Sequence, residues 1–395
     1  MLNNSVEVSN LIGNIRRAAR DVQPVAGLTH CHYKYPARFS PTFVAAAIES
    51  FSKPGDLILD PYMGGGTSIV EAMARNRRAV GCDLNSLAVF ITKVKTTVLT
   101  KRESCELVEW AHLVVPNLMY NNSAPDIDDV ICKIRTRNLE LPRAKAIKKF
   151  IALALISLDV LSSKKGEAFA RCALLNVSQW ALNGRKQQVS LSDFRARLTS
   201  STIEMLDAAD IYSKSLRAIP GRKPSPILIH GSSEYIGEHR HFNCGELADL
   251  VITSPPYPGV HVLYHRWQVD GRKETPAPYW IANCLDGQGS AYYNFGKRKQ
   301  ENHDDYFDAS LRTLQGIRSV MRDKATMIQM VAFSDPKSQL PRYLNNMTSA
   351  GFTELRHGSS GFKRIWRSVP RRNWHAELQG NTTSAREVVL IHKAS

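Results

Sequence analysis

Hydrophobic residues along this chain follow two patterns that alternate. Short, nearly continuous apolar runs predict buried strands, at residues 57–60, 78–83, 226–230, 249–252, 325–333 and 387–393. Apolar residues at helical spacing predict helices, at residues 8–20, 42–51, 69–75, 304–322 and 341–350. Because strands that alternate with helices form sheets covered on both faces, the pattern predicts an α/β fold with a mixed, mostly parallel sheet.

A long helical stretch interrupts this alternation. Three of its segments have apolar residues at helical spacing with basic residues between them: 139–161, 168–182 and 191–216. The sequence therefore predicts three parts. These are an N-terminal arm or packed helix at residues 1–29, an α/β domain built from 30–100 and 226–395, and a mainly helical insertion at 101–225. The basic residues of the insertion either grip phosphate groups or form solvated helix faces around a packed bundle.

The charge balance of the chain indicates a class of partner. The 395 residues include 52 Lys and Arg against 36 Asp and Glu, which gives a formal net charge of +16. Such a surplus suits nucleic acid, because neutralised phosphates supply most of its non-specific affinity for proteins. A basic surface that binds no polymer is the alternative, and attachment to a membrane surface is a weaker third reading.

Cysteines and apolar runs bear on location and on metal binding. The 7 cysteines form no Cys-x-x-Cys pair and leave an odd one over, which predicts a reducing cytoplasm. The polar N-terminus lacks the apolar core of a signal peptide. The most apolar run, residues 150–161, is too short to span a membrane and contains Asp159. The group His239, His241 and Cys244 lacks a fourth ligand, so we expect a polar loop and no metal site.

A glycine-rich turn follows the first predicted strand. The triple glycine at 64–66 leads into Thr67 and Ser68, which can cap the next helix. Glycine lets a ligand approach the backbone closely, and N–H groups at a helix start suit a carboxylate. The second strand ends in Asp83, about twenty residues on, as recognition of ribose hydroxyls requires. The unit predicts a cofactor with a ribose, and it lacks the lysine of a nucleoside-triphosphate loop.

A second motif, Thr253-Ser254-Pro255-Pro256-Tyr257, ends the strand at residues 249–252. Its prolines fix φ and remove N–H groups, so the strand stops in a stiff loop that presents a serine hydroxyl and carbonyl oxygens. Both kinds of group accept hydrogen bonds. The motif predicts an active-site loop, although a simple proline-rich turn after a core strand would have the same sequence.

Together the two motifs resemble those of the DNA amino-methyltransferases, which use S-adenosylmethionine to methylate the exocyclic nitrogen of cytosine or adenine. The resemblance implies a Rossmann-like methyltransferase fold and no metal. The serine-first form of the second motif is the one that the family associates mostly with N4 of cytosine. A third segment, from Tyr35 to Phe39, resembles the family segment that lies against the methionine end of the cofactor.

The resemblance also implies roles for individual residues. Asp60 would lie near the methionine amino group, and Asp83 would hold the ribose. Ser254 and Pro255 would accept the amino hydrogens of a base swung out of the helix, on which Tyr257 would stack. The implied cofactor-binding residues are Tyr35, Pro36, Phe39, Asp60, Pro61, Tyr62, Gly64, Gly66, Thr67, Ser68, Asp83, Leu84 and Thr253, and the implied catalytic residues are Ser254, Pro255, Pro256 and Tyr257. Ser232 and Ser233 stand where the family often has an acidic residue, so the pattern does not indicate an adenine contact there.

Residues 260–300 interleave aromatic and basic side chains without an apolar period. Such a mixture suits stacking on bases and pairing with phosphates, although some of the rings will be core. Because the segment directly follows the second motif, we expect a substrate-facing loop within the α/β domain. The expected DNA contacts are Tyr264, Arg266, Trp267, Lys297 and Arg298.

These inferences predict a site-specific DNA methyltransferase that acts on N4 of a cytosine flipped out of duplex DNA, in the cytoplasm of a prokaryote. No Pro-Cys dipeptide occurs, so the cysteine nucleophile of carbon-5 methylation is missing and no covalent intermediate is expected. The nearest alternative is N6 of adenine, and an RNA base methyltransferase and an inactive DNA-binding subunit are further ones. A cognate restriction endonuclease is a candidate partner, and monomer and dimer both stay open.

Overall fold

The computed structural model places the predicted strands in one sheet. It describes residues 2–21, 23, 25–36, 39–119, 136–185, 187–219, 221, 225–258, 267–274, 276–284, 295, 303–355, 364–368 and 386–395. None of the helices formed by these residues combines the length and the apolar character that a membrane crossing needs.

The described residues form a sheet of eight strands. They are β1 (Leu57–Asp60), β2 (Arg78–Asp83), β3 (Ile227–His230), β4 (Ala248–Thr253), β7 (Met321–Ala332), β8 (Phe352–Glu354), β9 (Ile365–Ser368) and β10 (Arg386–Ala394). Their order is β3-β2-β1-β4-β7-β10-β8, and β9 also pairs with β10. β10 runs antiparallel to β7, β8 and β9, whereas the other neighbours are parallel. The predicted α/β fold with a mixed, mostly parallel sheet is confirmed.

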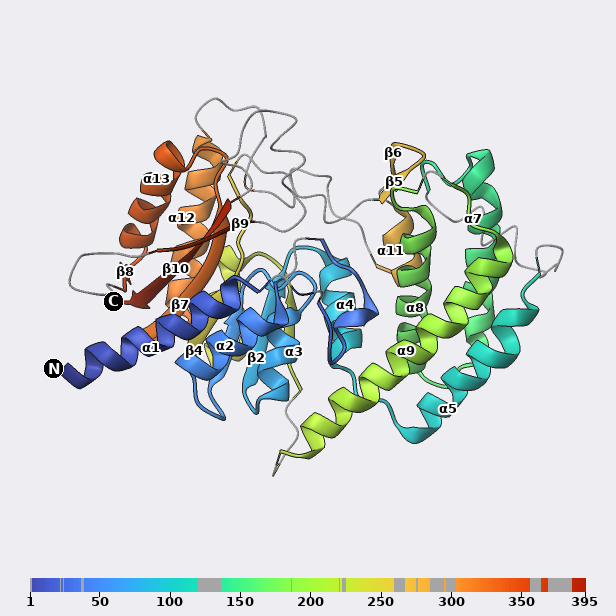
Figure 1. The fold of residues 1–395 in the computed structure, drawn as a ribbon, viewed down its shortest axis with the longest axis horizontal. Helices are drawn as coiled ribbons and strands as arrows, with labels where there is room; N and C mark the ends of the chain where they lie inside the picture. The colour runs from blue at the N-terminus through green and yellow to red at the C-terminus, as the bar shows by residue number, and fades with distance from the viewer. Residues whose placement is uncertain are drawn as a thin grey trace.

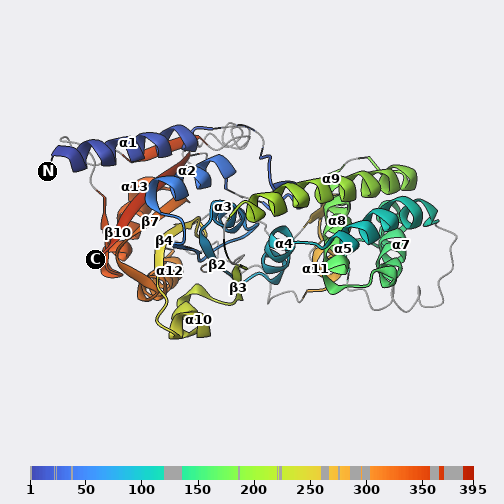
Figure 2. The same ribbon diagram turned by 90° about the horizontal axis from the view of Figure 1, so that it is seen from below.

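Helices cover both faces of the sheet, because successive residues of a strand point to opposite sides. Leu57 and Leu59 pack with α12 (Asp304–Ser319) and α13 (Pro336–Ser349). Ile58 packs on the other face with α2 (Pro41–Phe51), α3 (Thr67–Ala74) and α1 (Leu2–Ala19). Figure 2 shows α1 and α2 on one side of the strands and α12 on the other. The short α10 (Arg240–Asn243) precedes β4 in the chain.

Several predicted helix boundaries are wrong, and the helix expected at 8–20 begins at Leu2. The helix expected at 304–322 ends at Ser319, and an ion pair of 2.7 Å between Arg322 and Asp249 of β4 joins the next residues to the sheet. The helix expected at 341–350 begins earlier, at Pro336. The Asp335 side chain caps it by accepting the Lys337 N–H at 3.1 Å, and proline suits the first helical position because it needs no N–H partner.

The insertion forms a helical lobe beside the sheet (Figure 1). Its helices are α5 (Lys101–Glu109), α7 (Pro142–Ile156), α8 (Lys164–Leu182) and α9 (Leu191–Arg217). Most of their buried apolar residues belong to one hydrophobic cluster, which continues into α4 (Ser86–Thr96) of the α/β domain. The rings of Phe150 on α7 and Phe194 on α9 pack edge to face within this cluster, with 5.1 Å between their centroids.

Part of the predicted substrate-facing loop belongs to this lobe instead. The hairpin of β5 (Trp267–Val269) and β6 (Arg272–Glu274) and the helix α11 (Pro276–Ala282) pack on it, and their rings Trp267 and Tyr279 are buried in its cluster. Glu274 fixes the attachment by accepting the backbone N–H of Arg137 at 2.9 Å and of Asn138 at 2.5 Å. Apart from residues 267–274, 276–284 and 295, the predicted loop lies outside the described residues.

Candidate active site

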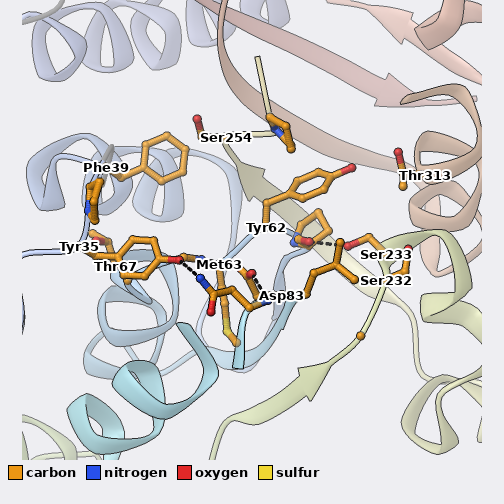
Figure 3. Close-up of a pocket in the computed structure, with 18 of the residues that line it drawn as sticks. Tyr35, Phe39, Tyr62, Met63, Thr67, Asp83, Ser232, Ser233, Ser254 and Thr313 are labelled. Carbon is orange, nitrogen blue, oxygen red and sulfur yellow. Dashed lines mark hydrogen bonds between the residues drawn. The ribbon is translucent and has the colours of Figure 1, made fainter. Parts of the chain in front are cut away.

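A pocket opens at the carboxyl ends of the central strands (Figure 3), and its empty space, open solvent included, is about 870 Å³. β2 and β3 lie on one side of β1, and β4 lies on the other side, so the order of connection reverses here. In open α/β sheets this reversal creates a crevice in which ligands bind. Both sequence motifs reach the crevice, because Gly64 after β1 and Ser254 after β4 line the same pocket.

The glycine turn shapes one side of the pocket. Gly64 and Gly66 have positive φ values of +47° and +72°, which residues with a side chain rarely adopt. A Cβ at Gly66 would lie 2.4 Å from the hydroxyl oxygen of Thr92, so only glycine fits without displacement. The Gly66 N–H donates to the Met63 carbonyl at 2.7 Å, and α3 begins at the next residue, Thr67.

Asp60 ends β1 as a buried carboxylate that joins the two motifs. One of its oxygens accepts the Thr253 hydroxyl at 2.7 Å and the Tyr62 N–H at 3.1 Å, and the other accepts the Ser68 hydroxyl. Burial raises the pKa of Asp60 to about 6, although these hydrogen bonds act in the opposite direction. Asp60, Ser68, Thr253 and Gly66 lie behind the pocket wall and fix its shape.

Asp83 ends β2 and lies in the pocket wall itself. Its carboxylate accepts the N–H of Gly64 at 2.9 Å and the N–H of Asn85 at 2.8 Å, which holds both oxygens at the edge of the sheet. Burial raises the pKa of Asp83 to about 6. Each carboxylate oxygen has a second lone pair, so Asp83 can still accept ligand hydroxyls. Leu84 continues the wall with an apolar side chain.

The segment around Tyr35 closes another wall, through Tyr35, Pro36 and Phe39. The Tyr35 hydroxyl accepts a hydrogen bond of 3.2 Å from the side-chain amide of Asn85. The amide oxygen of Asn85 accepts the hydroxyl of Tyr279 at 3.0 Å. Because Tyr279 belongs to α11, a hydrogen-bonded path joins this pocket wall to the helical lobe.

Trp267 supports the same wall from behind. Its indole N–H donates to the Tyr33 hydroxyl at 3.2 Å, and Gln179 of α8 donates to the same oxygen at 3.1 Å. The prediction of Trp267 as a DNA contact is wrong, because its ring is only 2% exposed and fills the core of the lobe. The other predicted DNA contacts lie outside the described residues: Tyr264, Arg266, Lys297 and Arg298.

The loop after β4 faces the pocket with only part of its motif. Ser254 and Pro256 line the pocket, whereas Pro255 and Tyr257 are buried beside it. Figure 3 shows Ser254 and Asp83 on opposite sides of the pocket, with Tyr62 between them. A ligand that touches Asp83 at one end can therefore present its other end to Ser254.

Hydrogen bonds with β7 and with Tyr257 of the same loop fix the Ser254 hydroxyl. Its oxygen lies 3.0 Å from the carbonyl oxygen of Met330 on β7 and 2.9 Å from the hydroxyl oxygen of Tyr257. The Tyr257 hydroxyl also donates to the carboxylate of Glu387 on β10, at 3.0 Å. Neither Met330 nor Glu387 carried a sequence signal, since each belongs to an ordinary apolar strand far along the chain.

Sequence reasoning missed or set aside several other lining residues. They are Met63, Gly65, Asn85, Gly231, Ser232, Ser233, Phe295 and Thr313. Ser232 and Ser233 come directly after β3, which neighbours β2, so the strand order places them at this edge of the sheet. The Ser233 hydroxyl donates to the Pro61 carbonyl. Their position after a predicted strand could have identified them. Phe295 and Thr313 come from later segments and carried no such signal.

Comparisons of the sequence with known proteins point to one family. A family profile described as DNA methylase matches residues 14–93, which include the Tyr35 segment and the glycine turn. The Type II methyltransferase M.MvaI of Kocuria varians is 40% identical over 255 residues, or 58% of this chain and 53% of that protein. The Type II methyltransferase M.MjaII of Methanocaldococcus jannaschii is 32% identical over 68 residues, or 17% of this chain and 13% of that protein. The chain thus spans about half the length of the first relative and less of the second.

Solved structures show a more distant likeness. TrmN from Thermus thermophilus is 11% identical with a TM-score of 0.32, over 90% of this chain and 49% of that chain. A rRNA methylase from Streptococcus thermophilus is 8% identical with a TM-score of 0.32, over 91% of this chain and 98% of that chain.

The sequence matches cover the residues of one side of the pocket. Residues 14–93 supply much of the pocket wall, from Tyr35 through the glycine turn to Asp83 and Leu84. The match to M.MvaI extends over more than half of the chain at 40% identity. Over these residues the chain is similar to DNA methyltransferases.

Proposed function

We propose that this protein transfers a methyl group from S-adenosylmethionine to the exocyclic N4 of a cytosine that is flipped out of duplex DNA at a specific sequence. One observation carries the proposal: the Asp83 carboxylate and the Ser254 hydroxyl line opposite sides of one pocket. The first suits a ribose, and the second suits an amino group. Similarity to DNA methyltransferases supports S-adenosylmethionine as the methyl donor.

The residues of the pocket fit this cofactor. Asp83 can accept ribose hydroxyls, and the N–H groups at the start of α3 suit the methionine carboxylate. Tyr62, Leu84 and Phe295 supply apolar surface for an adenine ring. When bound, S-adenosylmethionine supplies a methyl group activated by a positively charged sulfur.

Ser254 and Pro255 would prepare the amino group for reaction. The lone pair of an exocyclic amine is delocalised into the base, so the amine is a weak nucleophile. Acceptance of its two hydrogens by the Ser254 hydroxyl and the Pro255 carbonyl would turn the lone pair toward the methyl donor. Alignment of the two reactants in one pocket would then contribute most of the rate acceleration.

A basic hairpin on the helical lobe is our candidate DNA contact. Asp270 and Gly271 have φ values of +47° and +74° and form the tight turn between β5 and β6. The turn exposes Arg272 and Lys273, at the edge of the lobe that faces the sheet (Figure 1). Together with the net charge of +16, these side chains favour a phosphate contact near the pocket.

Nucleoside mass spectrometry tests the proposal. Genomic DNA from a methylation-free bacterial host that expresses the chain should contain N4-methylcytosine, and DNA from a host that expresses Ser254→Ala should not. N6-methyladenine instead would overturn the choice of base and keep the mechanism. Absence of any modified base in DNA would overturn the proposal, and transfer RNA from the same cells would then be examined. We further propose that DNA methylated in this way resists a cognate restriction endonuclease.

A further inference from the structure

We propose that Glu387 is a positioning residue that sets the direction of the hydrogen bonds at Ser254 and takes up the proton released by methyl transfer. The inference rests on the proposed function and goes beyond it, because Glu387 lies outside both motifs. It concerns a chain of three groups, Ser254, Tyr257 and Glu387, which we call the relay. Its links measure 2.9 Å from Ser254 to Tyr257 and 3.0 Å from Tyr257 to Glu387.

The register of the sheet brings these residues together. Glu387 of β10 pairs with Ala332 of β7. Ala332 lies two positions after Met330, whose carbonyl oxygen accepts a hydrogen bond from Ser254. The Glu387 side chain is 8% exposed, and Arg367 of β9 contacts its other oxygen at 2.6 Å and 2.8 Å. Among the described residues, Arg367 and Tyr257 are the charged or titratable groups in hydrogen-bond or ion-pair contact with Glu387, and Ala332 of β7 is its register partner.

The carboxylate decides which way the hydrogens point. A carboxylate oxygen only accepts, and it is a stronger acceptor than a hydroxyl, so the single Tyr257 hydrogen lies on Glu387. The Ser254 hydroxyl then donates its hydrogen either to the Tyr257 oxygen or to the Met330 carbonyl oxygen. In both arrangements the Ser254 oxygen keeps a free lone pair. It can therefore accept a hydrogen bond from the substrate amine, which orients the amine.

The same chain gives the released proton a route out of the pocket. As the amino nitrogen bonds to the methyl carbon, the carbon–sulfur bond breaks, its electron pair stays on sulfur, and the positive charge moves to nitrogen. The nitrogen must then lose a proton. This proton passes to Ser254 while the Ser254 hydrogen moves to Tyr257 and the Tyr257 hydrogen moves to Glu387. A protonated amino group on a base is a far stronger acid than a carboxylic acid, so the transfer is downhill.

A single-turnover assay of Glu387→Gln tests the relay. Glutamine keeps the size of the side chain and an acceptor oxygen, but it cannot take up a proton. At saturating DNA and S-adenosylmethionine we expect the transfer rate at neutral pH to fall by about 100-fold, the lower end of general-base contributions. The rate should recover as the pH rises, because hydroxide replaces the missing base, and cofactor affinity should not change.

Matched variants separate the relay from a structural effect. Glu354→Gln is the control, because Glu354 also pairs with an arginine, Arg364 at 2.7 Å, beside β10 but away from the pocket. It should transfer at the wild-type rate with the wild-type pH profile. Tyr257→Phe keeps the ring and breaks the relay, so it should show a similar loss that does not add to that of Glu387→Gln. A wild-type rate and pH profile in both relay variants, with Ser254→Ala inactive, would overturn the relay and keep the proposed function. An unmodified chain that methylates no DNA would overturn both.

Discussion

Replacement of Gly66 by alanine tests how tightly the glycine turn is built. Gly66 has a φ of +72°, and a left-handed conformation costs an ordinary residue about 1–2 kcal/mol. The new Cβ would also meet Thr92, at 2.4 Å from Oγ1, 2.6 Å from Cγ2 and 2.9 Å from Cβ. Overpacking of this kind costs about 1–3 kcal/mol. We therefore expect Gly66→Ala to lower the free energy of unfolding by about 2–5 kcal/mol.

Gly184→Ala is the matched control for this change. Gly184 has nearly the same φ, +71°, but a Cβ there would meet nothing within 4 Å. It should therefore show only the conformational cost of about 1–2 kcal/mol. Urea unfolding followed by circular dichroism measures both variants, and the difference between them isolates the contact with Thr92.

A second substitution locates the clash. Thr92→Ala removes two of the three close atoms, so it should recover part of the loss when it is combined with Gly66→Ala. The affinity for S-adenosylmethionine should fall with Gly66→Ala, because the Thr92 hydroxyl donates to the Gly64 carbonyl at 3.4 Å and its displacement would shift the pocket wall. Equal destabilisation by Gly66→Ala and Gly184→Ala would refute the reasoning.

Three further predictions concern the cofactor, pH and DNA. Asp83→Asn should weaken S-adenosylmethionine binding by about 10- to 100-fold in calorimetry, because hydrogen bonds to a charged group are lost; unchanged affinity would contradict the role of Asp83. Burial lowers the pKa of His32 from 6.5 to about 3. Between these two pH values the imidazole is protonated only in the unfolded chain, so the free energy of unfolding decreases as the pH falls. His32→Phe should remove about 2 kcal/mol of the stability difference between pH 7.5 and pH 5 in urea unfolding, and an unchanged difference would contradict this. Arg272→Ala with Lys273→Ala should reduce the slope of log affinity for DNA against log salt by about 2, whereas the exposed Lys337→Ala should leave that slope unchanged.

The sequence by itself determined the parts of the site that are local along the chain. The run from Leu57 to the triple glycine and the run from Ala248 to Tyr257 each encode a strand and the loop that follows it in consecutive residues. Asp83 could be found in the same way, from its distance to the glycine turn. Parallel strands bring their carboxyl ends to one edge, so the meeting of these motifs at one pocket also followed from pattern and topology.

Only the tertiary structure decided which distant groups complete the site. Asn85 joins Tyr35 to Tyr279, which lies 194 residues further along the chain, and Glu387 reaches Tyr257 across 130 residues. Trp267 lies in a segment whose aromatic and basic residues suit DNA contact, yet its side chain fills the core of the helical lobe. Such contacts depend on strand register and on how helices pack. A shift of one residue in β10 would turn Glu387 to the other face of the sheet, and no local pattern in the sequence records that choice.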